Sequence, residues 1–162
     1  MERYASHSDG QPPREPSLSR GLLHPSRADL TLPRRTIGQV RVLLIDDDAL
    51  VRDMLAETLA DEGIEVDGLA SAEDALILLG AGQMPDVLVT DIDLGPGLSG
   101  LDLVSIARER HPDVEVILIS GTTAERGSGP LRRRERFLQK PFAPAALAEA
   151  IRAAATDAIR RD

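Results

Sequence analysis

Three short runs of consecutive apolar residues limit the folds open to this chain more than any other feature. They are Val42–Ile45, Val87–Val89 and Val116–Ile119. A strand with one wet face alternates apolar and polar residues, whereas a strand covered by helices on both faces is apolar throughout. The three runs therefore predict buried strands at the centre of a sheet that carries helices on both sides.

These runs belong to an alternation of two signals that fills residues 40–162. Between the β-rich segments, apolar residues recur about every 3.6 positions, which is typical of amphipathic helices. Alternating strands and helices predict an α/β domain with a five-stranded parallel sheet, doubly wound, in which right-handed crossovers place helices on both faces. The predicted strands are Val40–Ile45, Ile64–Val66, Val87–Thr90, Val114–Ser120 and Arg136–Gln139.

Local signals mark several helix ends. Asp48 stands where the first helix should begin, and a single acid after a strand is most simply a helix N-cap. Ser71 with Asp74 has the spacing of a capping box for the second helix. The last predicted helix is Pro144–Arg160.

Two segments interrupt the alternation. The stretch 95–100 after the third strand is rich in glycine and predicts a loop instead of an immediate helix. The stretch 121–135 holds Gly127, Gly129 and Pro130, which should break or shorten any helix between strands four and five.

Charge and proline divide the chain near Gln39. Residues 1–39 hold six arginines, four acidic residues and five of the eleven prolines. Such a segment buries too little apolar surface to offset its ordering entropy, so we expect a disordered tail, with a short partner-binding arm as the alternative. Residues 40–162 form the predicted globular domain, which carries a net charge of −10 within a chain total of −8.

Composition excludes several functions. An acidic chain lacks the basic charge with which proteins hold nucleic-acid phosphates, and the absence of cysteine excludes disulfides and thiolate metal sites. No apolar run approaches the ~20 residues that a membrane span needs. We expect a cytoplasmic protein that contacts neither nucleic acid nor membrane.

Polar side chains gather where the predicted strands end. Asp46 and Asp47 follow the first strand, Asp91 follows the third, Ser120 ends the fourth and Lys140 follows the fifth. In parallel sheets these ends share one edge, where ligands bind. Clustered carboxylates favour a hard cation such as Mg²⁺, and an ammonium and a hydroxyl nearby complete a phosphoryl site. The sequence thus predicts phosphoryl-transfer chemistry.

Lys140 is distinctive because it is the only lysine among 19 basic residues. A compact, flexible ammonium acts as a point charge, which the planar fork of arginine does not reproduce. The competing reading of Ser120 is an ordinary turn serine. Asp46 and Asp47 resist such a reading, because adjacent acids beyond a buried strand are costly without a counter-ion.

Together these motifs resemble the receiver domain of two-component response regulators. The resemblance rests on Val42–Asp48, Asp86–Asp91, the Ser120-Gly121 pair and the Lys140-Pro141-Phe142 tripeptide, and it covers Val40 to about Ile159. It implies a flavodoxin-like fold.

The resemblance assigns a role to each acid. Asp91 would be the phosphoacceptor, taking a phosphoryl group from a phosphohistidine. Asp47 and Asp91 would coordinate Mg²⁺ directly and Asp46 mainly through water, and the backbone carbonyl of Asp93 would complete the protein ligands. The extra carboxylate of Asp93 should also affect how water reaches the aspartyl phosphate.

The resemblance also implies a switch. Lys140 would pair with one phosphoryl oxygen and the Ser120 hydroxyl with another, assisted by the Gly121 amide. Movement of Ser120 would then let Phe137 turn inward, although an ordinary packed Phe137 fits the sequence equally well. The Lys140–Pro141 bond is expected to be cis.

The implied function is a phosphorylation-dependent switch that catalyses only its own phosphorylation and dephosphorylation. Its donor would be a sensor histidine kinase or a histidine phosphotransfer protein. With no output domain expected after the last helix, it would signal by protein contact, with or without a phosphorylation-dependent homodimer. A phosphate relay or sink is the alternative within the family, as is a degenerate receiver that serves only as an interaction module.

An enzymatic alternative is a Mg²⁺-dependent phosphatase of the haloacid-dehalogenase type, suggested by Asp91-Ile92-Asp93. That family places its motif after the first strand and a threonine two residues beyond the second acid. Here the motif follows the third strand, and Gly95 occupies the threonine position.

Overall fold

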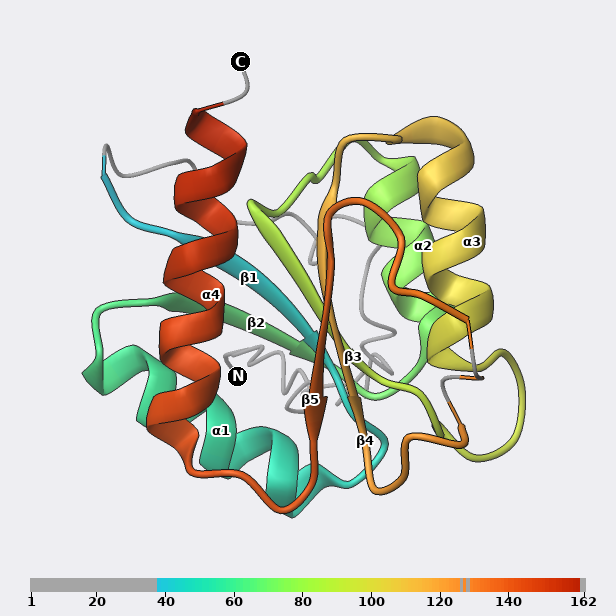
Figure 1. Cartoon of the computed structure of the whole chain (residues 1–162), viewed down its shortest axis with the longest axis horizontal. Coiled ribbons are helices and arrows are strands. Elements are labelled where there is room, and N and C mark those ends of the chain that lie inside the picture. Colours follow the sequence, from blue (N-terminus) through green and yellow to red (C-terminus); the bar gives the residue numbers. More distant parts are fainter. Residues whose placement is uncertain (1–37, 126, 128, 161–162) are drawn as a thin grey trace, which may run out of the picture.

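The computed structural model describes residues 38–125, 127 and 129–160 (Figure 1). Nearly all of the predicted tail, residues 1–37, therefore lies outside the described residues. The elements are β1 (Arg41–Ile45), α1 (Ala49–Asp61), β2 (Glu65–Leu69), α2 (Ala72–Gly80), β3 (Val87–Asp91), α3 (Gly100–Arg110), β4 (Glu115–Ser120), β5 (Glu135–Gln139) and α4 (Pro144–Ile159).

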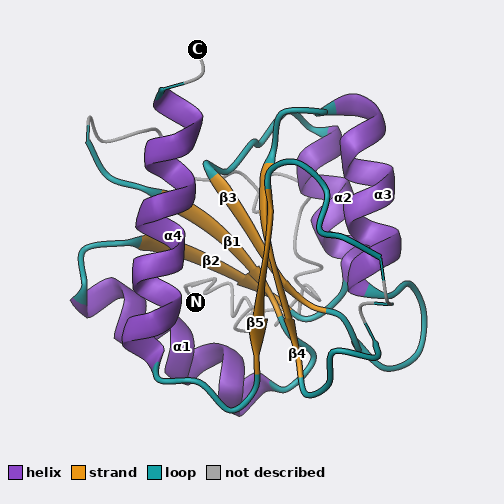
Figure 2. Cartoon of the chain, viewed as in Figure 1, coloured by secondary structure: helices purple, strands orange, loops and turns teal. Residues whose placement is uncertain are grey.

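The five strands form one parallel sheet in the order β2-β1-β3-β4-β5. Figure 2 shows α1 and α4 on one face of this sheet and α2 and α3 on the other. The prediction of a doubly wound, five-stranded parallel α/β fold is confirmed. The order reverses between β1 and β3, which places the topological switch point beside the ends of those two strands.

Alternate residues of the central strands build two apolar cores. Leu43 and Leu88 face α2 and α3, whereas Leu44 and Val89 face α1 and α4. All four are fully buried. Burial on both faces explains why these strands are apolar at successive positions, and it fixes the strand register because a slip by one residue would exchange the two cores.

The edge strand β2 differs most from its prediction. The β-rich signal covered only Ile64–Val66, whereas the strand runs over Glu65–Leu69. Its second half holds Asp67 and Gly68, which are disfavoured in strands. Pairing with β1 along its whole length extends the strand regardless, because backbone hydrogen bonds do not depend on those side chains.

The starts of α1 and α2 use the predicted cap residues, but the Asp74 carboxylate bonds to the Ser71 hydroxyl and not to the Ser71 amide as in a capping box. Asp48 caps α1 by accepting hydrogen bonds from the amides of Leu50 and Val51. Ser71 caps α2 by accepting from the Asp74 amide, and its hydroxyl also donates to the Asp74 carboxylate. None of the described helices has the length and apolar character required to cross a bilayer.

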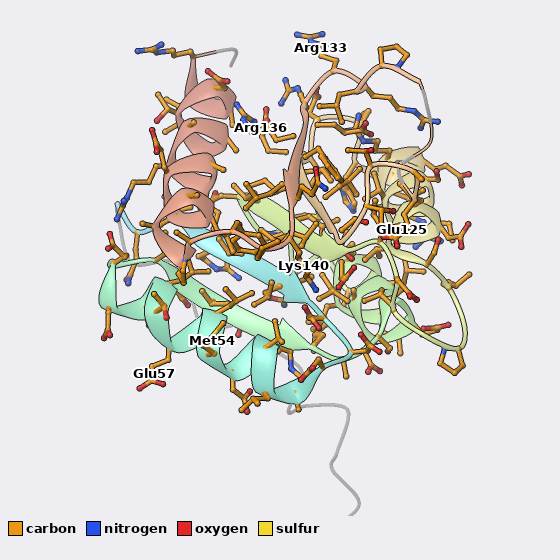
Figure 3. All side chains as sticks on the ribbon, turned by 60° about the horizontal axis from the view of Figure 1, so that its bottom comes forward. Met54, Glu57, Glu125, Arg133, Arg136 and Lys140 are labelled. Atoms are coloured by element: carbon orange, nitrogen blue, oxygen red, sulfur yellow. The ribbon has the colours of Figure 1, made fainter. Side chains whose placement is uncertain are left out.

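At the amino ends of β4 and β5, a buried acid is neutralised by arginine. Glu115 is 1% exposed and lies 3.0 Å from Arg136 and 3.6 Å from Arg134. Arg136 also pairs with Asp157 of α4 at 2.5 Å, which ties β5 to that helix (Figure 3). These charges have a structural role and lie at the opposite edge from the strand ends described next.

Candidate functional site

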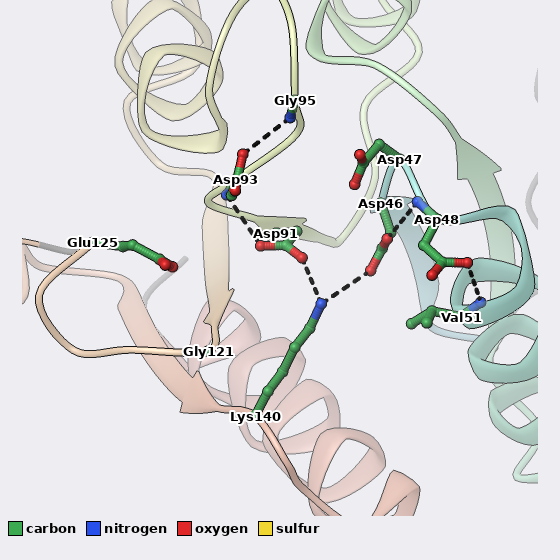
Figure 4. A pocket seen from close by; sticks show the side chains of 10 residues that line it. All are labelled: Asp46, Asp47, Asp48, Val51, Asp91, Asp93, Gly95, Gly121, Glu125 and Lys140. Atoms are coloured by element: carbon green, nitrogen blue, oxygen red, sulfur yellow. Dashed lines mark hydrogen bonds and ion pairs between the residues drawn. The ribbon is translucent and has the colours of Figure 1, made fainter.

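An open pocket lies at the carboxyl edge of the sheet, at the switch point between β1 and β3 (Figure 4). It is lined by six carboxylates and a single ammonium. Parallel strands in register deliver their following residues to the same edge, which is why residues far apart in sequence meet here. The lining residues are Asp46, Asp47, Asp48, Val51, Asp91, Asp93, Gly95, Gly121, Glu125 and Lys140.

Lys140 joins the two most buried carboxylates of the pocket. Its ammonium donates a hydrogen bond to Asp91 at 2.5 Å and lies 3.5 Å from Asp46. Partial burial alone would lower the pKa of Lys140, but the hydrogen bond and charge of Asp91, with those of Asp46, outweigh it and raise the pKa above its ordinary value. The ammonium is therefore fully charged at neutral pH, as a partner for anionic oxygens must be.

Asp46 is 2% exposed, and this burial raises its pKa above the ordinary aspartate value. The Asp48 amide, which donates to its carboxylate at 2.9 Å, and the nearby Lys140 both oppose that shift. Asp91 adds to it by like-charge repulsion. A cation among these acids would oppose the shift, because an opposite charge favours the ionised carboxylate.

Two hydrogen bonds from neighbouring residues hold Asp91 in place. The Asp93 amide donates to the Asp91 carboxylate at 3.1 Å, and Thr90 donates its hydroxyl to the Asp91 carbonyl at 2.8 Å. Gly100 at the start of α3 passes so close that a Cβ there would stand 2.1 Å from the Asp91 carbonyl oxygen. Only glycine fits beside the end of β3 at this point.

The side chain of Asp93 has a local structural contact as well. Its carboxylate accepts a hydrogen bond from the Gly95 amide at 3.1 Å, and both residues line the pocket. Gly95 has a φ of 71°, which favours glycine, and Asp47 Oδ2 would lie 3.4 Å from a Cβ there. The loop predicted after the third strand is present, and α3 begins only at Gly100 with a Ser99 cap.

Ser120 is fully buried at the end of β4 and is not among the pocket-lining residues. Its Oγ lies within hydrogen-bonding distance of two acceptors, the Thr122 carbonyl at 2.8 Å and the Glu125 carboxylate, and it accepts from the Thr122 amide at 3.0 Å. Sequence reasoning missed Glu125. Its only sequence signal is its position five residues after Ser120, within the segment predicted to lack a regular helix.

That segment joins β4 directly to β5, and none of its described residues is helical. The expected break of the helix there is thus complete. Phe137 on β5 pairs with Leu118 and is partly buried against the core under α2 and α3. Its role as a switch stays a prediction. The Lys140–Pro141 peptide is cis, as expected.

Six predicted site residues therefore meet at the pocket: Asp46, Asp47, Asp91, Asp93, Gly121 and Lys140. Within the described part of the chain, no three His, Cys, Asp or Glu side chains stand close enough together to enclose an ion. That arrangement still fits Mg²⁺, which keeps several waters and is usually bound through one or two carboxylates. The donor set consists of oxygens, the atoms that Mg²⁺ prefers.

Comparison with known proteins identifies relatives. The family model described as "Response regulator receiver domain" matches residues 42–152. The chain is 38% identical over 125 residues to the C4-dicarboxylate transport transcriptional regulatory protein DctD of Pseudomonas aeruginosa, covering 72% of this chain and 25% of that protein. It is 32% identical over 106 residues to the response regulator MprA of Mycolicibacterium vanbaalenii, covering 64% and 45%. The chain thus spans less than half the length of these two curated relatives.

Solved structures agree. A response regulator receiver protein from Sinorhizobium medicae superposes with a TM-score of 0.69 at 29% identity, covering 76% of this chain and 99% of that one. The response regulator TrrA of Thermotoga maritima, solved in complex with Mg²⁺-BeF, superposes with a TM-score of 0.63 at 29% identity, covering 72% and 99%.

Proposed function

The chain belongs to the response regulator receiver domain family, and on that basis we propose that it is a phosphorylation-driven switch with Asp91 as the phosphoacceptor. The observation that carries the proposal is the 2.5 Å hydrogen bond from Lys140 to the Asp91 carboxylate, within a pocket at the switch point of the sheet. A carboxylate beside a charged ammonium suits a reaction in which further negative charge arrives.

In the proposed reaction, a carboxylate oxygen of Asp91 attacks the phosphorus of a phosphohistidine. The new oxygen–phosphorus bond forms as the phosphorus–nitrogen bond breaks, and the histidine nitrogen leaves with its electron pair and takes up a proton. Lys140 stays beside the transferred group and balances its charge. The Asp93 amide holds the Asp91 carboxylate through its other oxygen, Oδ1, which orients the nucleophile.

We assign Mg²⁺ binding to Asp46, Asp47, Asp91 and the backbone carbonyl of Asp93. When bound, the ion would neutralise charge on the transferred group. Burial raises the pKa of Asp46, and a divalent cation at the same edge would oppose that shift because it favours the charged carboxylate. Asp48 serves as the α1 cap and is not assigned to the ion.

The donor we propose is a sensor histidine kinase or a histidine phosphotransfer protein, and the compartment is the cytoplasm. Apolar side chains beside Lys140 support a protein donor. Met54 of α1 is 49% exposed, and Met54, Lys140 and Phe142 line one open apolar groove. A protein that brings a histidine to Asp91 would also contact this groove, because Lys140 belongs to both the groove and the pocket.

The first test separates a switch from a phosphatase. With acetyl phosphate and Mg²⁺, intact-mass measurement should show one phosphoryl group per chain and then a plateau, because the acceptor is a single side chain. The same protein should release no sustained product from p-nitrophenyl phosphate. Continuous turnover of that ester, without a stable adduct, would favour the haloacid-dehalogenase-type phosphatase instead.

The second test concerns the donor surface. Met54→Glu should slow phosphotransfer from the cognate phosphorylated donor about tenfold, a loss of about 1.4 kcal/mol, because a charge would be buried at the contact. Ile77→Glu on α2 is the matched control, since Ile77 is 53% exposed on the other face of the sheet. Labelling of both variants by acetyl phosphate checks the site itself. Equal donor rates for the two variants would refute this surface.

A further inference from the structure

Glu125 lies in the pocket where the proposed phosphoryl transfer takes place, and it contacts Ser120. It lies in the connection between β4 and β5 and points its carboxylate into the acidic pocket (Figure 4). The same carboxylate reaches the hydroxyl of Ser120, and the Glu125 amide lies 3.4 Å from the Thr122 hydroxyl oxygen. The connection thus places a sixth acid opposite the single ammonium.

The Ser120 hydroxyl has one proton to donate. In this structure its acceptors are the Thr122 carbonyl and the Glu125 carboxylate. A phosphoryl group on Asp91 would be a third acceptor and a stronger one, since it carries roughly −1.5 to −2 charges and three oxygens. When the hydroxyl turns to the phosphoryl group, it can no longer donate to Glu125.

Charge repulsion also makes Glu125 and a phosphoryl group on Asp91 unfavourable neighbours. The pocket already holds six carboxylates against Lys140, and a phosphoryl group would add further negative charge at Asp91. Like charges that share a site disfavour one another. Of the six acids, Glu125 alone belongs to the β4–β5 connection; the other five lie on the β1–α1 and β3–α3 sides. It is therefore the acid that a movement of that connection would remove.

We propose that Glu125 is a regulatory residue that competes with the phosphoryl group for the Ser120 hydroxyl, so that phosphorylation of Asp91 releases residues 121–125 at the start of the β4–β5 connection. This inference rests on the proposed phosphoacceptor function. The Glu125–Ser120 contact defines the unphosphorylated state, and the phosphoryl–Ser120 contact defines the phosphorylated state. Because each state excludes the other contact, Glu125 opposes phosphorylation and the connection carries the conformational signal.

The test uses Glu125→Gln, which keeps the side-chain shape and removes the charge, and Glu125→Ala, which removes the contact. Neither strands a buried donor, because Ser120 keeps the Thr122 carbonyl as its acceptor. Labelling by acetyl phosphate in Mg²⁺ should be faster by about fivefold or more in Glu125→Ala, which corresponds to about 1 kcal/mol off the barrier. Glu125→Gln should lie between the alanine variant and wild type. Glu57→Gln on α1 is the matched control and should label at the wild-type rate (Figure 3).

A second readout follows the connection itself. In amide NMR spectra, beryllofluoride with Mg²⁺ should shift the Gly121 and Gly127 signals of wild type, and unlabelled Glu125→Ala should already lie part of the way towards that position. If wild type is labelled but Glu125→Ala labels at the wild-type rate or more slowly, or the two glycine signals stay in place, Glu125 does not have this role. If wild type takes up no label, the proposed phosphoacceptor function is itself wrong, and the Glu125 proposal falls with it.

Discussion

Asp91→Asn should abolish labelling by acetyl phosphate in Mg²⁺, while wild type takes up one phosphoryl group. An amide is not a nucleophile towards phosphorus, so the label has no acceptor. The substitution preserves the local structure because the side-chain oxygen can still accept from the Asp93 amide, and Lys140 retains Asp46 at 3.5 Å. Intact-mass spectrometry measures the adduct, and its loss with hydroxylamine identifies an acyl phosphate.

The matched control for that variant is Asp61→Asn, the same change at an exposed position near the end of α1. It should label as wild type does. Thermal unfolding of both variants checks that the fold is intact. Equal labelling of Asp91→Asn and wild type would refute the assignment of the phosphoacceptor.

Removal of Mg²⁺ should have a comparable effect. Chelation with EDTA should slow acetyl phosphate labelling about 100-fold or more, because the ion supplies several kcal/mol of charge stabilisation and each factor of ten corresponds to about 1.4 kcal/mol. Added Mg²⁺ should restore the rate. Lys140 alone cannot balance a phosphoryl group among six carboxylates.

The same chelation should leave the far-ultraviolet circular dichroism unchanged. The two apolar cores lie on the faces of the sheet and do not depend on ligands at its carboxyl edge. A loss of helical signal on chelation would show that the ion is structural and would contradict its proposed role in transfer. Labelling at an unchanged rate in EDTA would also contradict the proposed role of Mg²⁺ in phosphoryl transfer.

Most of the site could be predicted because its residues directly follow strands of the sheet, and regular structure determines where those strands end. Runs such as Val42–Ile45 and Val87–Val89 mark buried parallel strands, and a residue that follows such a strand must lie at the carboxyl edge. Asp46, Asp91 and Lys140 come together for that reason alone. The cap at Asp48 was also predictable, since its chemistry is local to the start of α1.

The contacts of Ser120 could not be predicted in the same way. The described residues of the connection from β4 to β5 show no repeating hydrogen-bond pattern, so neither a period of two nor one of 3.6 places their side chains. Glu125 reaches Ser120 through the path of an irregular segment, which depends on how the rest of the fold anchors its ends. Gly100 is similar, because nothing in its local sequence reveals the Asp91 carbonyl beside it.

The sequence by itself determined the parallel sheet, its two cores and the acids at its edge, because hydrophobic periodicity and strand ends are local properties of the chain. Only the tertiary structure decided which side chains face one another across that edge. Lys140 between Asp46 and Asp91, and Glu125 at Ser120, are pairs set by strand order and loop path. Such pairs depend on distances through space that no local pattern records.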